Sequence, residues 1–236
     1  MTSTNQTLQQ QAAVISGVSL LIMTIAAIFA YGYVHSSLVL EGDAAITFQN
    51  IQASPSLFRL EILGWLIILV TDVLVAWGFY VFLKPYHQGY ALVAGWLRLL
   101  YTAILGIAVS HLVVVSRLIQ KNATGESLDQ IAQQVMDSIT AFEAIWSFGL
   151  ILFGLHLLVV GLIAMGTKKI PKVVSILVLL AGFSYTLIHF MDIFFPQLEE
   201  MTGLVEGILL APMFLGEIGF GLWLWVKGRK LPSDPT

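Results

Sequence analysis

Cysteine is absent from the 236-residue sequence, and charged residues make up only 11% of it. The absence of cysteine excludes disulfide bonds, thiol catalysis, iron–sulfur clusters and thiolate-bound zinc. Soluble domains usually contain about 25% charged residues, so a chain this poor in charge is not an ordinary soluble globule. The formal net charge of −3 and the lack of basic tracts also argue against nucleic acid as a partner.

Apolar residues dominate the chain, because 58% of its residues are hydrophobic. Several apolar runs reach about 20 residues, which is enough to cross a hydrocarbon core about 30 Å thick. These runs do not alternate between apolar and polar residues, which argues against a β-barrel. We predict an all-α, polytopic transmembrane bundle that forms a single domain over residues 1–236. Its six spans are expected at about 13–34, 57–83, 90–116, 141–165, 173–195 and 205–226.

The lysine and arginine residues predict the orientation of this bundle. Seven of the eleven fall in loops or tails on one side of the membrane, three fall on the other side, and Arg98 lies inside a span. Because positively charged loops stay in the cytoplasm, we expect both termini to be cytoplasmic in a multi-pass protein of the cell membrane. The two longer loops then face outward.

Each of the two longer outer loops is predicted to contain a short amphipathic helix. In the first loop, Asp43 can cap a helix that runs through Ile46 to Ile51, and Ser54-Pro55 can then start the second span. In the other loop, apolar residues recur at helical spacing: Leu128, Ile131, Val135, Ile139 and Phe142. We interpret this second helix as a surface packing element that runs into the fourth span, or alternatively as a lid over an outward-facing pocket.

Ionisable residues inside the spans are the strongest functional signal. A charged group at the bilayer centre costs about 2.5–3.5 kcal/mol, so each must face the bundle interior and find a partner. At a rise of about 1.5 Å per residue, one layer near mid-depth contains five candidate ligand-binding residues. They are Asp72, Arg98, His156, Tyr185 and Glu217.

Within this layer, we expect Arg98 to pair with Asp72, since guanidinium and carboxylate groups match in a bidentate way. His156 and Glu217 then form a second pair or stay open to a ligand. Pro212 and nearby glycines interrupt the sixth span beside Glu217, which indicates a binding point or hinge there, or else simply close packing. The alternative for the whole layer is a polar clamp that only locks the helices together.

A second group of ionisable residues lies nearer the predicted outer ends of the spans: His111, His189, Asp192, Glu143 and Glu61. His189 and Asp192 are three residues apart and share one helix face. Two imidazoles with one or two carboxylates form a credible set of zinc or iron ligands. We therefore name these five residues as a candidate metal site, with haem as a less favoured option. The alternatives are a proton relay, or interfacial groups bonded to one another or to water.

Small residues repeat every seven positions on two spans and predict close helix packing. They are Ser147, Gly154 and Gly161 on the fourth span and Gly64, Thr71 and Gly78 on the second. The sequence contains no Gly-rich phosphate loop, no nucleophile elbow and no HExxH motif.

Several short segments occur in an order that is typical of one family. They include Gly42-Asp43, Leu57-Phe58-Arg59, Lys84-Pro85, Arg98-Leu99, Phe153-Gly154-Leu155-His156, Leu180-Ala181-Gly182 and Gly216-Glu217. Over nearly its whole length the chain resembles the six-span membrane proteins called domain of unknown function 4386. The resemblance implies a six-helix protein of a bacterial inner membrane and carries over no activity. Its matching positions include Asp72, Arg98, His156 and Glu217.

The function we predict from the sequence is binding of a small or amphipathic ligand at the mid-depth layer, with proton-coupled transport through His156 and Glu217 as its stronger form. One alternative is an intramembrane metal-dependent hydrolase with an outward-facing site, in which Glu143 or Glu61 acts as base. Another is a non-catalytic partner or sensor subunit. The expected partners are the lipid bilayer and a small amphipathic or lipid-like ligand, and association into oligomers is compatible with the sequence.

Overall fold

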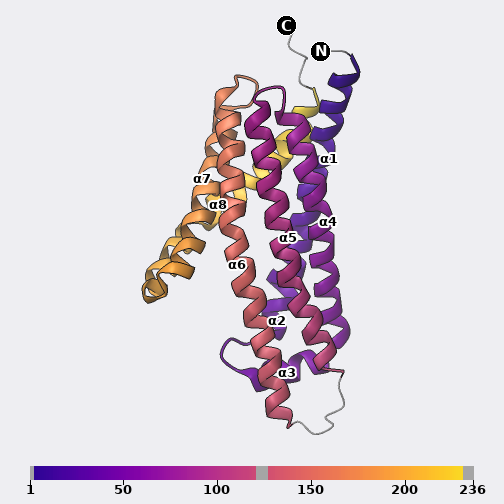
Figure 1. Ribbon diagram of the computed structural model, residues 1–236, viewed down its shortest axis with the longest axis vertical. Coiled ribbons are helices and arrows are strands. Elements are labelled where there is room, and N and C mark those ends of the chain that lie inside the picture. The colour runs from indigo at the N-terminus through magenta and orange to yellow at the C-terminus, as the bar shows by residue number, and fades with distance from the viewer. Residues whose placement is uncertain (1–2, 121–126, 231–236) are drawn as a thin grey trace. The chain divides into compact units, whose positions relative to one another are not determined.

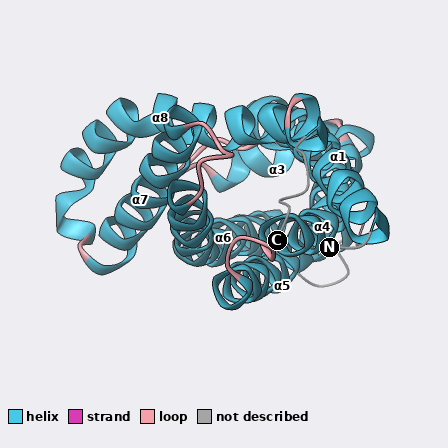
Figure 2. Ribbon diagram, turned by 90° about the horizontal axis from the view of Figure 1, so that it is seen from above, coloured by secondary structure: helices cyan, strands magenta, loops and turns pink. Residues whose placement is uncertain are grey.

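Every regular element in the described part of the chain is a helix. The computed structural model describes residues 3–120 and 127–230, and no strand occurs among them (Figures 1 and 2). Six helical segments in this part are long and apolar enough to cross a membrane: Thr7–Leu38, Pro55–Leu83, Gln88–Leu118, Leu128–Gly166, Lys172–Phe194 and Pro196–Lys230. The predicted spans fall on these segments with an overrun of one residue, at Phe195. The predicted all-α, six-span fold is confirmed.

The chain divides into two compact units. The first contains Met1–Ile22, Thr71–Thr102 and Ser147–Thr236, and the second contains Met23–Val70 and Ala103–Trp146. Four helices contribute residues to both units: α1 (Ser3–Ala27), α4 (Pro55–Leu83), α5 (Gln88–Leu118) and α6 (Leu128–Gly166). Two long helices belong wholly to the first unit: α7 (Lys172–Phe194) and α8 (Glu199–Val226).

Small residues let the helices of the first unit approach one another closely. A Cβ atom added to Gly154 of α6 would lie 2.7 Å from the carbonyl oxygen of Gly182 on α7. One added to Gly78 of α4 would lie 3.0 Å from the carbonyl oxygen of Ala12 on α1. Backbone atoms cannot move aside as a flexible side chain can. The predicted packing role of Gly78 and Gly154 is therefore confirmed.

The first unit also joins the beginning of α1 to the ends of α4 and α8. The Gln9 side chain donates a hydrogen bond to the carbonyl oxygen of Phe82, at 2.9 Å. A Cβ atom on Gly228, after α8, would be within 3.5 Å of both Ala13 and Phe82. These contacts agree with helices that alternate in direction. The cytoplasmic location of the termini stays a prediction.

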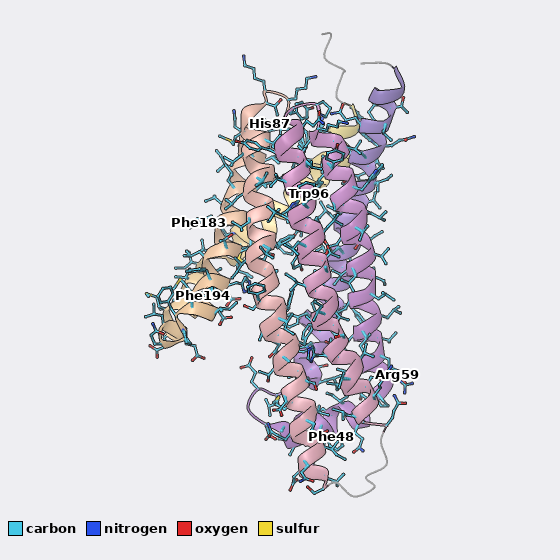
Figure 3. The ribbon with its side chains drawn as sticks, viewed as in Figure 1. Phe48, Arg59, His87, Trp96, Phe183 and Phe194 are labelled. Atoms are coloured by element: carbon cyan, nitrogen blue, oxygen red, sulfur yellow. The ribbon has the colours of Figure 1, made fainter. Side chains whose placement is uncertain are left out.

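Large apolar side chains cover the surface of the first unit. Trp96, Phe183 and Phe194 are 61%, 55% and 54% exposed and are labelled in Figure 3. Exposed aromatic residues at this density would be costly in water, and a hydrocarbon environment suits them. The surface therefore agrees with the membrane location that hydropathy indicates.

The second unit contains a stretch of π-helix at the end of the first span. α1 continues as η1 (Ile28–His35), an eight-residue π-helix, which is followed by the short α2 (Ser36–Leu38). π-Helices are rare and are often found at functional sites. The apolar periodicity of the first span did not predict this change of helix type.

The first long loop folds as predicted. The chain turns at Gly42, whose φ of +77° favours glycine. Asp43 then caps α3 (Ala44–Ala53), because its Oδ1 accepts a hydrogen bond from the Ile46 amide at 2.9 Å. Pro55 occupies the first position of α4, where its missing N–H has no cost.

The second long loop also contains the predicted amphipathic helix, which runs into the fourth span. The amphipathic segment is the beginning of α6, a single helix of 39 residues. No glycine or proline separates Leu128 from Phe148, so nothing in the sequence ends the helix between them. Ile131, Val135 and Ile139 are buried, whereas Leu128 is 61% exposed. The apolar face is thus a packing surface of the second unit.

Candidate functional site

Four of the five predicted mid-depth residues meet within the first unit, and we call them the Arg98 cluster. They are Asp72 of α4, Arg98 of α5, His156 of α6 and Glu217 of α8. The first three side chains are completely buried, and that of Glu217 is 16% exposed. The structure therefore brings these residues together, as depth along each span predicts.

Arg98 lies beside two carboxylates. Its Nη2 is 2.6 Å from Asp72 Oδ1 and 3.6 Å from Glu217 Oε1. The expected pair of Arg98 with Asp72 is confirmed. The expected pair of His156 with Glu217 is not formed, because Glu217 contacts the guanidinium instead. One fixed positive charge thus faces two acidic groups.

His156 holds Arg98 in place. A guanidinium has only donors, so the 3.3 Å contact between Arg98 Nη1 and His156 Nε2 makes Nε2 the acceptor. Nδ1 then carries the proton and donates to the carbonyl oxygen of Ala94, at 2.8 Å. The ring also stacks on Phe79, with centroids 5.7 Å apart. With both nitrogens engaged, His156 fits the role of a positioning residue better than that of a proton carrier.

Aromatic rings surround the guanidinium. The Arg98 guanidinium carbon is 5.2 Å from the Phe153 ring centroid and 5.8 Å from that of Phe79. Tyr185, the fifth predicted residue, packs edge-on against Phe153 with centroids 5.0 Å apart. Aromatic faces attract a cation, and the apolar surroundings strengthen every charge interaction among the four residues.

The helix that carries Glu217 contains a proline and two glycines close to this acid. Pro212 lies inside α8 and supplies no backbone N–H to it. Gly216 packs directly on Leu177 and Ala181 of α7, so a larger residue has no room there. Gly219 has nothing within 4 Å of an added Cβ atom. Close packing therefore requires a glycine at position 216, whereas it does not require one at position 219.

The five predicted metal ligands are divided between the two units. Among residues 3–120 and 127–230, no group of three or more His, Asp or Glu side chains is arranged to hold a metal ion. In the first unit, Ser147 Oγ is 3.0 Å from His189 Nδ1 and donates to Asp192 Oδ2 at 2.8 Å. The hydroxyl thus links these two residues.

The other three predicted ligands belong to the second unit. His111 is half-buried on α5. Glu61 of α4 and Glu143 of α6 contact His35, at the end of η1. They face opposite nitrogens of one ring, so their oxygens do not converge on a common ion. Within the second unit, Glu61 and Glu143 therefore act as partners of His35, and the zinc or iron centre stays a prediction.

His35, Glu61 and Glu143 make a second buried polar group, which we call the His35 cluster. His35 Nδ1 is 2.7 Å from Glu61 Oε1, and Nε2 is 3.1 Å from Glu143 Oε1. The Glu61 side chain is wholly buried, whereas that of Glu143 is 35% exposed. The Trp65 indole donates to the same Glu61 oxygen at 3.4 Å.

Aromatic residues enclose His35. Its ring stacks on Tyr31 at a centroid distance of 5.0 Å and lies 5.7 Å from Phe142. Trp146 meets Tyr31 at 4.8 Å and Trp65 at 4.9 Å, both edge-on. Sequence analysis missed His35 because it lies just beyond the predicted end of the first span. The spacing of Tyr31 and His35, four residues apart on a helix, was the available signal.

Comparison with known proteins gives the family. The model of the family described as "Domain of unknown function (DUF4386)" matches residues 15–228, a range that contains both clusters. The chain belongs to this family. A relative from Archaeoglobus fulgidus, named "Uncharacterized protein", is 26% identical over 171 residues, which cover 72% of this chain and 85% of the relative. No solved structure matches the chain. This member of the DUF4386 family is thus a membrane-spanning helical bundle.

Proposed function

We propose that this DUF4386 protein binds a small or amphipathic anion at the Arg98 cluster and takes up one proton on Glu217 as it does so. The supporting observation is that one guanidinium faces two carboxylates, at 2.6 and 3.6 Å, inside a buried site. His156 is neutral in its observed bonding, so Arg98 balances only one of the two negative charges. A single proton makes the cluster neutral, and burial of unbalanced charge is costly.

Glu217 is the group that suits the exchange. It has the longer contact with Arg98 and is 16% exposed, whereas Asp72 is completely buried against the guanidinium. When Glu217 carries a proton, it no longer competes for Arg98. A carboxylate, sulfonate or phosphate group can then replace it, because guanidinium binds such oxyanions strongly.

Proton uptake would also allow the protein to transport the bound anion. An anion that enters with one proton adds no net charge to the membrane interior, where a lone charge is costly. Pro212 and Gly219 weaken the regularity of α8 on both sides of Glu217, so this helix is suited to bending as the acid moves. The setting we propose is a multi-pass protein of the cell membrane with both termini in the cytoplasm, which rests on the lysine and arginine distribution.

Calorimetry with decanesulfonate tests this function. The probe is amphipathic and stays anionic at all relevant pH values, so any proton taken up on binding goes to the protein and is released by the buffer. Titration into the purified protein in a non-ionic detergent, repeated in buffers of different ionisation enthalpy, gives the number of protons bound with the probe. We expect one proton for the native protein and none for Glu217→Gln.

The affinities complete the test. Glu217→Gln removes the competing charge and should bind decanesulfonate about tenfold more tightly, which corresponds to about 1.4 kcal/mol. Glu206→Gln, an exposed acid on the same helix, is the matched control and should behave like the native protein. Equal binding of decyltrimethylammonium, or proton uptake that persists in Glu217→Gln, would contradict the proposal.

A further inference from the structure

The His35 cluster has a hydrogen-bonding pattern that depends on protonation. A neutral imidazole has one N–H and one bare nitrogen, whereas a charged imidazolium has two N–H groups. Both ring nitrogens of His35 lie within hydrogen-bond distance of carboxylate oxygens, at 2.7 and 3.1 Å. Carboxylates accept hydrogen bonds and do not donate them. Both bonds can therefore form together only when the ring carries its second proton, or when one acid carries it.

The surroundings favour the charged ring. Tyr31 presents its face to His35, and such stacking stabilises a cation. Glu61 Oε1 accepts from both His35 and the Trp65 indole, while Glu61 Oε2 is buried without a hydrogen bond among the described residues. The buried Glu61 thus depends on His35 for charge compensation. In the described part of the chain, the titratable groups that face His35 are Glu61 from α4, Glu143 from α6 and Tyr31 from η1.

Glu61 and Glu143 differ in how each carboxylate can be stabilised when His35 loses its second proton. Glu61 is wholly buried, so it needs the remaining N–H of a neutral ring. Glu143 is 35% exposed and lies in the half of α6 that belongs to the second unit, so it can be solvated instead. Loss of the proton therefore frees Glu143 first and leaves the bond between His35 and Glu61 in place.

We propose that His35, Glu61 and Glu143 form a second proton-binding site, in which the proton carried by His35 ties the end of η1 to α6. The site uses none of the residues of the Arg98 cluster, so it is independent of the proposed anion binding. Release of the proton breaks the bond between His35 at the end of η1 and Glu143 of α6, and so weakens the hold on the part of α6 that precedes Glu143. The π-helix ends at His35, so the same bond also fixes the last turn of that segment.

Nitrogen NMR on protein labelled with ¹⁵N-histidine tests the bonding directly. We expect both ring nitrogens of His35 to show the shift of a protonated nitrogen, and His156 to show one protonated and one bare nitrogen. His35→Gln identifies the His35 signals by their loss. In Glu143→Gln, the Nε2 signal of His35 should move to the bare-nitrogen range, while Nδ1 stays protonated. A His35 ring with one bare nitrogen in the native protein would overturn the proposal.

Hydrogen exchange measured by mass spectrometry tests the consequence. In Glu143→Gln, amides in the buried part of α6 between Ile131 and Phe142 should exchange about fivefold faster, since one stabilising bond is lost. The α4 segment that contains Glu61 should be unchanged. Asp137→Asn is the control, because Asp137 is an exposed acid of α6 that bonds Gln133 of the same helix. Equal exchange in the two variants would contradict the proposal, even if decanesulfonate binding proves correct.

Discussion

The Arg98 cluster and the His35 cluster contain similar groups and differ in which of them can lose its charge. In the first, the cation is a guanidinium, which stays protonated in proteins, so only a carboxylate can exchange a proton. In the second, the cation is an imidazole with a carboxylate on each nitrogen, so the cation itself can be removed. The comparison teaches that the type of cation decides where a buried proton is exchanged.

Burial differs in a way that supports this contrast. The three most buried members of the Arg98 cluster are Asp72, Arg98 and His156, and the acid with some exposure is Glu217. In the His35 cluster, Glu61 is the buried acid and Glu143 the exposed one. Each cluster therefore pairs one fixed carboxylate with one that can leave, and the following variants are designed to separate these roles.

Arg98→Met should have the largest effect, because it leaves the buried Asp72 without a cation. We expect the free energy of unfolding to fall by about 3–5 kcal/mol, as is typical when one partner of a buried ion pair is removed. Reversible unfolding in mixed detergent micelles measures it. The double variant Asp72→Asn with Arg98→Met should recover most of the loss. A loss of stability below about 1 kcal/mol in the single variant would show that the pair is not buried as described.

Gly216→Ala should come next, because its Cβ atom would meet the Leu177 backbone. We expect about 1–3 kcal/mol of destabilisation. We also expect Glu217 to be displaced from Arg98, so that adding Glu217→Gln changes the affinity for decanesulfonate less than it does in the native protein. Gly219→Ala on the same helix has free space and should be neutral or slightly stabilising. Equal effects of the two substitutions on thermal stability would contradict the close contact of α7 and α8 at Gly216.

His35→Gln should cost less than Arg98→Met, about 1–3 kcal/mol, since it leaves Glu61 with an incomplete set of hydrogen bonds. The amide of glutamine can still donate one bond, and Glu143 can be solvated. Unfolding in the same micelles gives the comparison, with His111→Gln as the control on a half-buried histidine of the second unit. If the free energy of unfolding fell as far as in Arg98→Met, the cation of the His35 cluster would be as indispensable as that of the Arg98 cluster, which would contradict the contrast between them.

Glu217→Gln should have the smallest effect on stability, within about 0.6 kcal/mol of the native protein, the size typical of polar contacts between helices in membranes. It removes an attraction to Arg98 and also an excess negative charge near Asp72. Thermal unfolding measures this change. A large destabilisation would mean that Glu217 is a fixed structural partner of Arg98, like Asp72, and not an exchangeable one.

Much of the fold follows from hydropathy, because a span of about 20 apolar residues has few alternatives in a membrane. The meeting of Asp72 and Arg98 also follows, since each must find a partner at its own depth. Depth does not give the rotation of each helix about its axis. For that reason the sequence left His156 and Glu217 either as a pair or open to a ligand, whereas the structure places His156 between Arg98 and the Ala94 carbonyl.

The same limit applies to the outer group of residues. The sequence did not indicate that Glu61 and Glu143 both contact His35. The π-helix Ile28–His35 changes the helical periodicity at the point where the apolar run ends, so no simple pattern relates His35 to the rest of the first span. A histidine at the end of a span, one helical turn after a tyrosine, is the kind of signal that a later sequence analysis can use.

Infrared difference spectroscopy tests the central claim most directly, because a protonated carboxyl group has a carbonyl band that carboxylates and imidazoles lack. We predict that decanesulfonate induces this band in the native protein and in Glu143→Gln, and that the band is absent in Glu217→Gln. A band that persists in Glu217→Gln, or that never appears in the native protein, would contradict proton exchange on the acid beside Arg98.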